Sequence, residues 1–238
     1  MQKFFTIIGG MGTMATESYL HQLNLRTPAH ADQEYLNYIL VNHATVPDRT
    51  TYILDHSQVS PLPSLLEDIR QQSQLHPAFF TLPCNTAHYF YDDLQAAAGD
   101  IPILHMPRET VQEIQRKFPQ AQRIGITGTR GTIADKIYEH ELERVGLTPV
   151  LPTSAIEDAT MELIYDDIKE RDVVDAQLFH RIVREMVEQQ HADVVILGCT
   201  ELSLAQEREP ETTFPIVDGQ SVLVDRTLER ALKLRQAD

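Results

Sequence analysis

The sequence predicts an α/β protein made of two similar domains, each a parallel sheet flanked by helices. Three features support this prediction. Short apolar runs alternate with segments of helical periodicity along the whole chain, which is typical of parallel sheets with crossover helices. Each half contains a glycine loop after an apolar run, IIGGMGT in the first half and IGITGTRGT in the second. Each half also contains one of the two cysteines, placed where another apolar run ends.

The first half begins with the apolar run 4–8, which ends at two glycines and predicts the first strand. Thr13 is then a plausible N-cap of a helix that extends to about Leu25. The other elements expected in this half are a strand at 38–41, a helix around 65–69, a strand at 78–82, a helix at 86–97 and an apolar run at 101–104.

The second half repeats the alternation. The elements expected in it are strands at 123–127, 149–151 and 194–197, helices at 133–145, about 156–168 and 175–190, a last strand from Ile216 and a last helix to about Leu234. We therefore expect one domain made of residues 1–103 and 216–238, carrying Cys84, and a second domain made of residues 104–215, carrying Cys199.

The spacing of the repeated features indicates an internal duplication with pseudo-twofold symmetry. Cys84 lies 72 residues after Gly12, and Cys199 lies 68 residues after Gly131. Ligands of open parallel sheets bind beyond the carboxyl ends of the strands. We therefore expect the two cysteines to lie on opposite walls of one cleft.

The composition narrows the function. The chain has 238 residues, of which 42% are hydrophobic and 23% charged, and its formal net charge is −15. This charge argues against binding to nucleic acid or to an anionic membrane surface, since both require basic patches. No apolar run approaches the roughly 18 residues of a membrane span, and the N-terminal MQKFFTIIGG predicts a strand rather than a signal peptide. We therefore expect a cytoplasmic protein without a stable disulfide.

The two cysteines share one local context. Each follows a predicted strand and precedes a predicted helix start, at Asn85-Thr86 and at Thr200-Glu201. A single cysteine at a strand end is commonly a small buried apolar residue, but the matched pair favours chemistry, because a helix N-terminus stabilises a thiolate. Two such groups facing one carbon could remove a proton from one side and return one from the other. No metal site is predicted, because neither CxxC nor HxxxH spacing occurs.

Five motifs resemble the aspartate/glutamate racemase family, and most closely its aspartate racemase branch. In chain order they are GGMGTMAT (9–16), PDRT (47–50), PCNTAH (83–88), TGTRGT (127–132) and GCTE (198–201). The resemblance spans nearly the whole chain, and PCNTAH together with GCTE is its most specific part. It implies two similar α/β domains with the active site between them, a homodimer, and inversion of an amino acid at Cα by two cysteines without a cofactor.

Carried over position by position, the resemblance implies that Cys84 and Cys199 are the acid/base pair. In the implied order, Cys199 deprotonates the L-enantiomer and Cys84 the D-enantiomer. Thr13 stands where many relatives have Pro. The substrate-binding residues that the resemblance implies are Asn85, Thr86 and Thr200 at the α-carboxylate and Met11, Gly12, Thr13, Thr127 and Thr129 along the pocket.

A dicarboxylate substrate needs local cations in a protein of net charge −15. The candidates for its distal carboxylate are Arg49 in PDRT and Lys169 at the end of YDDIK. Lys169 is followed by Glu170-Arg171, where relatives frequently have Gly. Glu201 could orient Cys199 or cap its own helix. We therefore expect the racemisation of L-aspartate to D-aspartate, with glutamate as a second substrate to test.

Three other functions stay open at this point. Residues 10–15 fit the dinucleotide fingerprint G-x-G-x-x-A, but the strand at 38–41 ends in Asn42-His43 rather than in the acidic residue that holds a ribose hydroxyl. A cofactor-free isomerase or decarboxylase of small dicarboxylates could use the same scaffold, although some of these relatives keep only one of the two cysteines. A two-lobed cleft also suits a non-catalytic ligand-binding protein. His88 is more easily explained as a supporting residue than as a catalytic one.

Overall fold

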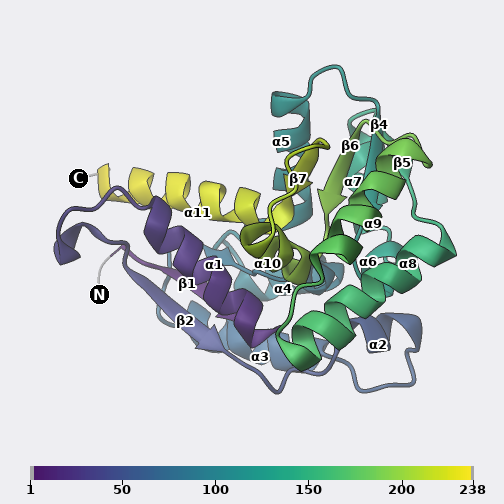
Figure 1. The fold of residues 1–238 in the computed structure, drawn as a ribbon. Helices are drawn as coiled ribbons and strands as arrows, with labels where there is room; N and C mark the ends of the chain where they lie inside the picture. The colour runs from purple at the N-terminus through teal and green to yellow at the C-terminus, as the bar shows by residue number, and fades with distance from the viewer. Residues whose placement is uncertain (1–2, 237–238) are drawn as a thin grey trace.

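The structure, a computed structural model, describes residues 3–236 and contains two separate parallel sheets. The first sheet has the strand order β2-β1-β3. Its strands are β1 (Phe5–Gly9), β2 (Tyr38–Asn42) and β3 (Phe80–Thr81), and Ile103 adds an isolated bridge to Phe80. Two parallel sheets with flanking helices are the architecture that the sequence predicts (Figure 1).

The second sheet has the strand order β5-β4-β6-β7. Its strands are β4 (Arg123–Thr127), β5 (Thr148–Val150), β6 (Val194–Leu197) and β7 (Ile216–Asp218). Strand β7 pairs in parallel with β6 of the second sheet. The predicted domain boundary is therefore wrong for residues 216–218, which were expected in the first domain. The physical reason is packing, since Val217 joins the apolar cluster that contains Val194 and Ile196 of β6.

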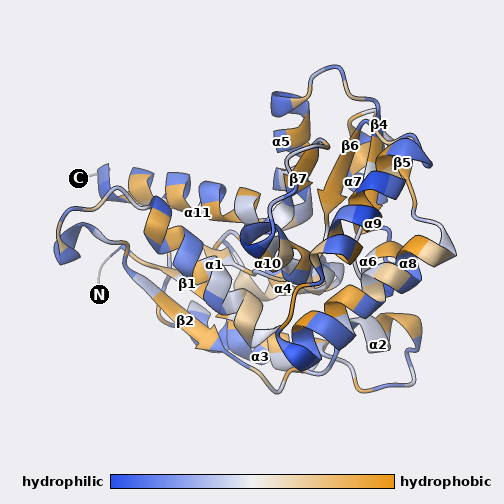
Figure 2. Cartoon of the chain, in the orientation of Figure 1, coloured by the Kyte–Doolittle hydropathy of each residue, from blue (hydrophilic) through white to orange (hydrophobic). Residues whose placement is uncertain are grey.

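Helices cover both sheets, and Figure 2 shows many of them striped with apolar and hydrophilic residues. The first half contains α1 (Thr13–Arg26), the short 3₁₀ helix η1 (Asp32–Glu34), α2 (Arg49–Leu54), α3 (Leu62–Ser73), the 3₁₀ helix η2 (Thr86–Phe90) and α4 (Tyr91–Ala98). The rest of the chain contains α5 (Met106–Lys117), α6 (Arg130–Ala134), α7 (Ile137–Arg144), α8 (Ser154–Met161), the π-helical segment η3 (Glu162–Glu170), α9 (Ala176–Glu188), α10 (Thr200–Arg208) and α11 (Gly219–Gln236). Within residues 3–236, no helix combines the length and apolar character required to span a bilayer.

Several helix boundaries differ from the expectation. Gly12, not Thr13, is the N-cap of α1, so Thr13 begins the helix with an exposed side chain. The helix expected at 86–97 is the 3₁₀ helix η2 followed by α4, and the one expected at 156–168 is α8 followed by η3. Helix α5 is an addition to the predicted elements.

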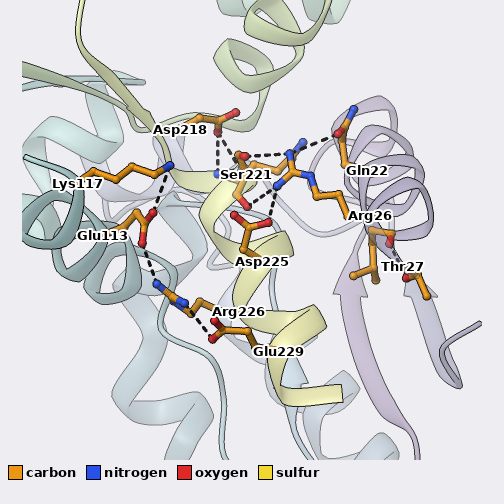
Figure 3. Close-up of polar contacts among 12 residues, drawn as sticks. Gln22, Arg26, Thr27, Glu113, Lys117, Asp218, Ser221, Asp225, Arg226 and Glu229 are labelled. Atoms are coloured by element: carbon orange, nitrogen blue, oxygen red, sulfur yellow. Dashed lines mark hydrogen bonds and ion pairs between the residues drawn. The ribbon is translucent and has the colours of Figure 1, made fainter. Parts of the chain in front are cut away.

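The C-terminal helix α11 connects the two halves, because it packs against both α1 and α5 (Figure 1). Arg26 of α1 donates to the backbone oxygen of Ser221 at 3.1 Å, to its Oγ at 2.9 Å and to Asp225 at 2.8 Å (Figure 3). On the other side, Arg226 forms an ion pair with Glu113 of α5 at 2.8 Å. A helix bound to both halves fixes how the carboxyl ends of the two sheets face each other.

Candidate functional site

A small pocket, with a cavity volume of only about 10 Å³, lies between the two halves and contains both cysteines. Cys84 and Cys199 are free thiols, and both are buried. The pocket is lined by Met11, Asp48, Arg49, Thr50, Cys84, Asn85, Thr86, Thr129, Tyr165, Lys169, Cys199, Thr200 and Glu201.

Equivalent strands of the two sheets supply the walls of this pocket. In each sheet a central strand, β1 or β4, is followed by a glycine loop, and a neighbouring strand, β3 or β6, is followed by a cysteine. Because all strands are parallel, these loops and cysteines lie at the carboxyl ends of their sheets. Cys199 is itself the N-cap residue of α10, and Cys84 directly precedes Asn85, the N-cap residue of η2.

Cys199 is held as a protonated thiol by a neighbouring carboxylate. Its Sγ donates a hydrogen bond of 2.8 Å to Oε2 of Glu201, which is buried as well. Burial and the charge of Glu201 raise the pKa of Cys199 well above its usual range, although the Lys169 ammonium opposes this shift. The sequence-based expectation of a thiolate at this helix start is therefore corrected, because desolvation and the carboxylate outweigh the helix N-terminus.

Arg49 lies beside Cys84. Burial alone would lower the pKa of the Arg49 guanidinium, but the neighbouring Cys84 and Asp48 raise it, so this side chain stays a cation in the pocket. One of its terminal nitrogens donates to the backbone oxygen of Pro47 at 3.0 Å. Cys84 thus has a cation beside it and Cys199 a carboxylate, so the two cysteines have opposite electrostatic partners.

Lys169 enters the pocket from the π-helical segment η3. Its Nζ lies 3.7 Å from Oε1 of Glu201 and 4.2 Å from the centre of the Tyr165 ring. Burial would lower the pKa of Lys169, but Glu201 and Cys199 raise it. Tyr165 in turn donates to Oδ2 of Asp48 at 3.4 Å. The structure thus brings both cations proposed from the sequence, Arg49 and Lys169, to the same pocket.

Two buried donors in the pocket have no protein partner within residues 3–236. These are Nε of Arg49 and Nδ2 of Asn85. Buried polar groups are nearly always hydrogen-bonded in folded proteins. We therefore interpret the two donors as sites for acceptor oxygens of a ligand, such as those of a carboxylate.

Threonine hydroxyls connect the two walls of the pocket. Thr50 of α2 donates to Thr129, the N-cap residue of α6, at 2.9 Å. Thr86 lies 3.2 Å from Oγ1 of Thr132 and 3.5 Å from Oγ1 of Thr129. These contacts pair residues of the first half with residues of the second, so the position of one half determines the shape of the pocket.

Some residues expected at the pocket lie elsewhere. Thr127 donates its hydroxyl to the backbone oxygen of Ile196 at 2.7 Å, inside the second sheet, because a threonine in a central strand can bond to its neighbour. Thr13 is exposed on α1. Gly12 does not line the pocket but is adjacent to it, since a Cβ at this position would lie 3.4 Å from Oε1 of Glu201.

The pocket also contains residues that the sequence reasoning missed. Thr50 directly follows Arg49 in PDRT, and Tyr165 precedes Lys169 by one helical turn, so both could have been found from the motifs. Asp48, which precedes Arg49 in the same motif, also lines the pocket. Among the residues that the structure describes, no group of three or more His, Cys, Asp or Glu side chains is arranged to hold a metal ion.

Comparisons with known proteins agree with this geometry. The Asp/Glu/Hydantoin racemase family model matches residues 8–227. A broad specificity amino-acid racemase, RacX of Bacillus subtilis (strain 168), is 25% identical over 230 residues, which cover 95% of this chain and 97% of that protein.

Solved structures of related proteins have the same fold. An aspartate racemase from Picrophilus torridus covers 98% of both chains with a TM-score of 0.81 at 22% identity. A glutamate racemase from Francisella tularensis in complex with D-glutamate has a TM-score of 0.64 at 13% identity, covering 99% of this chain and 83% of its own. The match to the family model spans most of the sequence, and the chain belongs to the Asp/Glu/Hydantoin racemase family.

Proposed function

We propose that the protein racemises an acidic amino acid, L-aspartate to D-aspartate, by a two-base mechanism that needs no cofactor. The observation that supports this proposal most directly is the pocket between the halves, where Cys84 comes from one sheet and Cys199 from the other. Inversion at Cα requires a base on one face of the carbon and an acid on the other. Two thiols from opposite walls supply this pair.

The reaction proceeds by one proton transfer on each face of the substrate. A thiolate removes the Cα proton, so the Cα–H bond breaks, an S–H bond forms, and the electron pair is delocalised into the α-carboxylate. The opposite thiol then delivers its proton to Cα and becomes the thiolate. In the order expected for this chain, Cys199 removes the proton of the L-enantiomer and Cys84 that of the D-enantiomer.

Both carboxylates of aspartate have candidate partners. Backbone and side-chain donors of Asn85, Thr86 and Thr200, which begin η2 and α10, suit the α-carboxylate. The cations Arg49 and Lys169 suit the distal carboxylate, since one offers a planar fork and the other a point charge. The aspartate racemase of similar structure supports this choice of substrate.

A broader specificity is the second candidate. The relative with 25% identity over nearly the whole chain is a broad specificity amino-acid racemase. In addition, the pocket contains the acids Asp48 and Glu201 beside its two cations, so its net charge does not depend on a second substrate carboxylate. Uncharged amino acids therefore belong in the first assay.

The test is incubation of the protein with L-aspartate, L-glutamate, L-alanine and maleate separately, without added cofactor, followed by chiral chromatography. We expect D-aspartate to form fastest and alanine to react poorly. Equal rates with alanine and aspartate would support the broad specificity, and conversion of maleate alone would support an isomerase of dicarboxylates. The cytoplasmic location and the homodimer stay predictions.

The mechanism is tested by replacing each thiol. Cys84→Ser and Cys199→Ser keep the shape of the side chain, but a hydroxyl is a far weaker acid than a thiol. We expect each variant to lose nearly all racemisation with an unchanged circular dichroism spectrum. In deuterated water, the product of the unaltered protein should carry deuterium at Cα. Retention of most activity by either variant would exclude the two-base mechanism.

A further inference from the structure

Tyr138 extends from the second half of the molecule to Asn85 in the first half. Tyr138 is part of α7, its side chain is fully buried, and its Oη donates to Oδ1 of Asn85 at 2.5 Å. Gly219 leaves room for this contact, because a Cβ at that position would lie 2.9 Å from the tyrosine oxygen and 3.3 Å from Oδ1 of Asn85. Asn85 lines the pocket, whereas Tyr138 lies behind it.

The phenol is a permanent hydrogen-bond donor. Burial raises the pKa of Tyr138, although a hydrogen bond with Thr110 opposes this shift, so the phenol keeps its proton at neutral pH. Thr110 uses its own proton in a bond of 2.8 Å to the backbone oxygen of Met106. Oη of Tyr138 donates its single proton to Oδ1 of Asn85, so the amide is held with Nδ2 on its other side.

The nitrogen on that side has no protein acceptor within the described chain. Asn85 is only 2% exposed and is adjacent to Cys84 in the pocket wall. A primary amide can present either its oxygen or its NH₂ group to a ligand, and only the NH₂ group attracts a carboxylate. The hydrogen bond from Tyr138 selects the NH₂ group.

We propose that Tyr138 is a positioning residue, which fixes the side-chain amide of Asn85 so that Nδ2 binds a carboxylate oxygen of the substrate. Tyr138 does not touch the substrate and acts only through Asn85. The assignment of this carboxylate to an amino-acid substrate rests on the proposed function. Because Tyr138 and Asn85 belong to different halves, this donor is in place only when the halves are together.

The kinetic test compares Tyr138→Phe, Asn85→Ala and the double variant with Tyr19→Phe as the control. Tyr19 is also fully buried, and its hydroxyl is hydrogen-bonded to Thr227 at 2.7 Å, away from the pocket. We expect Tyr138→Phe to lower kcat/KM for aspartate by at least about fivefold, as for the loss of a hydrogen bond to a charged group. Tyr19→Phe should stay within about twofold of the unaltered protein.

The double variant shows whether Tyr138 acts through Asn85. If it does, Tyr138→Phe causes no further loss in the Asn85→Ala background, because the amide it positions is absent. Losses that multiply in the double variant would overturn the proposal. An equal loss in Tyr19→Phe would also overturn it, since that result indicates a general effect of destabilisation.

A second readout is independent of racemase activity. In the Cys199→Ser background only Cys84 can be alkylated, and the rate with iodoacetate, which carries a carboxylate, is compared with the rate with neutral iodoacetamide. We expect the preference for iodoacetate to fall by at least about threefold in Tyr138→Phe and not in Tyr19→Phe. An unchanged preference would overturn the proposal. A reduced preference in a protein that does not racemise aspartate would retain Tyr138 as a positioning residue and reject the proposed substrate.

Discussion

At the scale of single residues, the two thiols differ in the charge of their partners. Cys199 donates to the Glu201 carboxylate at 2.8 Å, whereas Cys84 lies beside the Arg49 cation. A two-base reaction needs one thiolate and one thiol at a time. Under the proposed mechanism, the Glu201 carboxylate favours a resting form in which Cys199 is the acid. In the expected order, this form is ready for the D-enantiomer, and Glu201 accepts the hydrogen bond of the proton that Cys199 must lose before it can act on the L-enantiomer.

Replacing Glu201 tests this asymmetry. Glu201→Gln removes the negative charge but keeps an acceptor beside Cys199. Because burial and the charge of Glu201 raise the pKa of Cys199, we expect the variant to lower this pKa. The midpoint of iodoacetamide alkylation against pH, measured in the Cys84→Ser background, should shift down equally. Glu207→Gln, on the same helix but bonded to Ser18, is the control; an unshifted midpoint for Glu201→Gln would mean that burial alone sets the pKa.

Under the proposed function, the preference for a distal carboxylate depends on Arg49. Arg49→Ala removes a buried cation whose Nε has no hydrogen-bond partner among residues 3–236, and a charge-assisted contact is worth about 1.5–3 kcal/mol. We expect kcat/KM for aspartate to fall by at least about tenfold, with a smaller loss for alanine. Arg130→Ala, which removes a cation paired with Asp158 outside the pocket, should leave both values unchanged. A silent Arg49→Ala would contradict the carboxylate clamp.

The site residues that could be predicted from the sequence are those whose place in the structure is set by the motif in which they stand. Cys84, Cys199 and Arg49 stand in short motifs at strand ends, and each lines the pocket. Tyr138 could not be found in this way, because its only signal is a hydrogen bond to a residue 53 positions away. Thr127 was misplaced for the opposite reason, since a threonine at the end of a strand can face its neighbouring strand as well as the pocket.

At the scale of elements, α5 shows why a helix can be missed in a prediction from sequence. Its segment MPRETVQEIQRK has widely spaced buried apolar residues and many charges. Its N-terminus is capped by two histidines rather than by the usual Ser, Thr, Asp or Asn. Nδ1 of His105 accepts from the Arg108 amide at 3.1 Å, and Nε2 of His88 accepts from the Met106 amide at 3.1 Å. His88 also bonds to the backbone oxygen of Cys84 at 2.9 Å, so this helix start is tied to the pocket.

These caps predict a loss of stability in mild acid. Both histidines accept hydrogen bonds and must be neutral. Burial lowers the pKa of His88, and burial together with His88 and Arg108 lowers that of His105 to about 2; Arg144 and the Tyr91 ring also face His105. In the unfolded chain a histidine titrates near pH ~6.5. Below that pH the unfolded state binds more protons, so stability falls as the pH decreases, by up to about 1.4 kcal/mol per pH unit and histidine.

The measurement is urea unfolding between pH 7.5 and 5.5, values chosen so that carboxylates contribute little. His105→Asn keeps a good N-cap residue but removes one titrating group, and we expect it to reduce the slope of the unfolding free energy against pH by roughly half. His140→Asn, on α7 outside the cap of α5, is the matched control and should leave the slope unchanged. If His105→Asn and the unaltered protein had the same slope, the neutral His105 cap would not be a cause of the pH dependence.

At the scale of the whole molecule, the pocket exists because two duplicated sheets face each other. The duplication and the meeting of the cysteines could be predicted from the repeated motifs. The attachment of residues 216–218 to the second sheet could not be predicted, because a short apolar run can pair with the edge of either sheet. Only the observed pairing with β6 shows to which sheet it belongs. The contacts between the halves could not be predicted either, because they join α2 with α6 and Asn85 with Tyr138, which lie far apart in the sequence.

Gly131 tests whether the closed arrangement of the halves is the active one. A Cβ at Gly131 would lie 2.8 Å from Cα of Thr50 in the opposite half. That atom is backbone and cannot rotate away, so Gly131→Ala must push α2 and α6 apart. Gly131 is not in the left-handed region, and alanine favours a helix, so α6 itself should not be disrupted.

Separation of the halves should have two opposite effects. Racemisation of aspartate should slow by roughly tenfold or more, because Cys84 and Cys199 no longer flank one carbon at the required distance. Alkylation of the cysteines by neutral iodoacetamide should become faster, because the buried thiols become more accessible. Arg130→Ala, one residue earlier and directed toward Asp158, is the control and should change neither rate. If both rates fell in Gly131→Ala, the substitution would have damaged α6 rather than opened the pocket; if racemisation were unchanged while alkylation rose, contact between the halves would not be required for the chemistry.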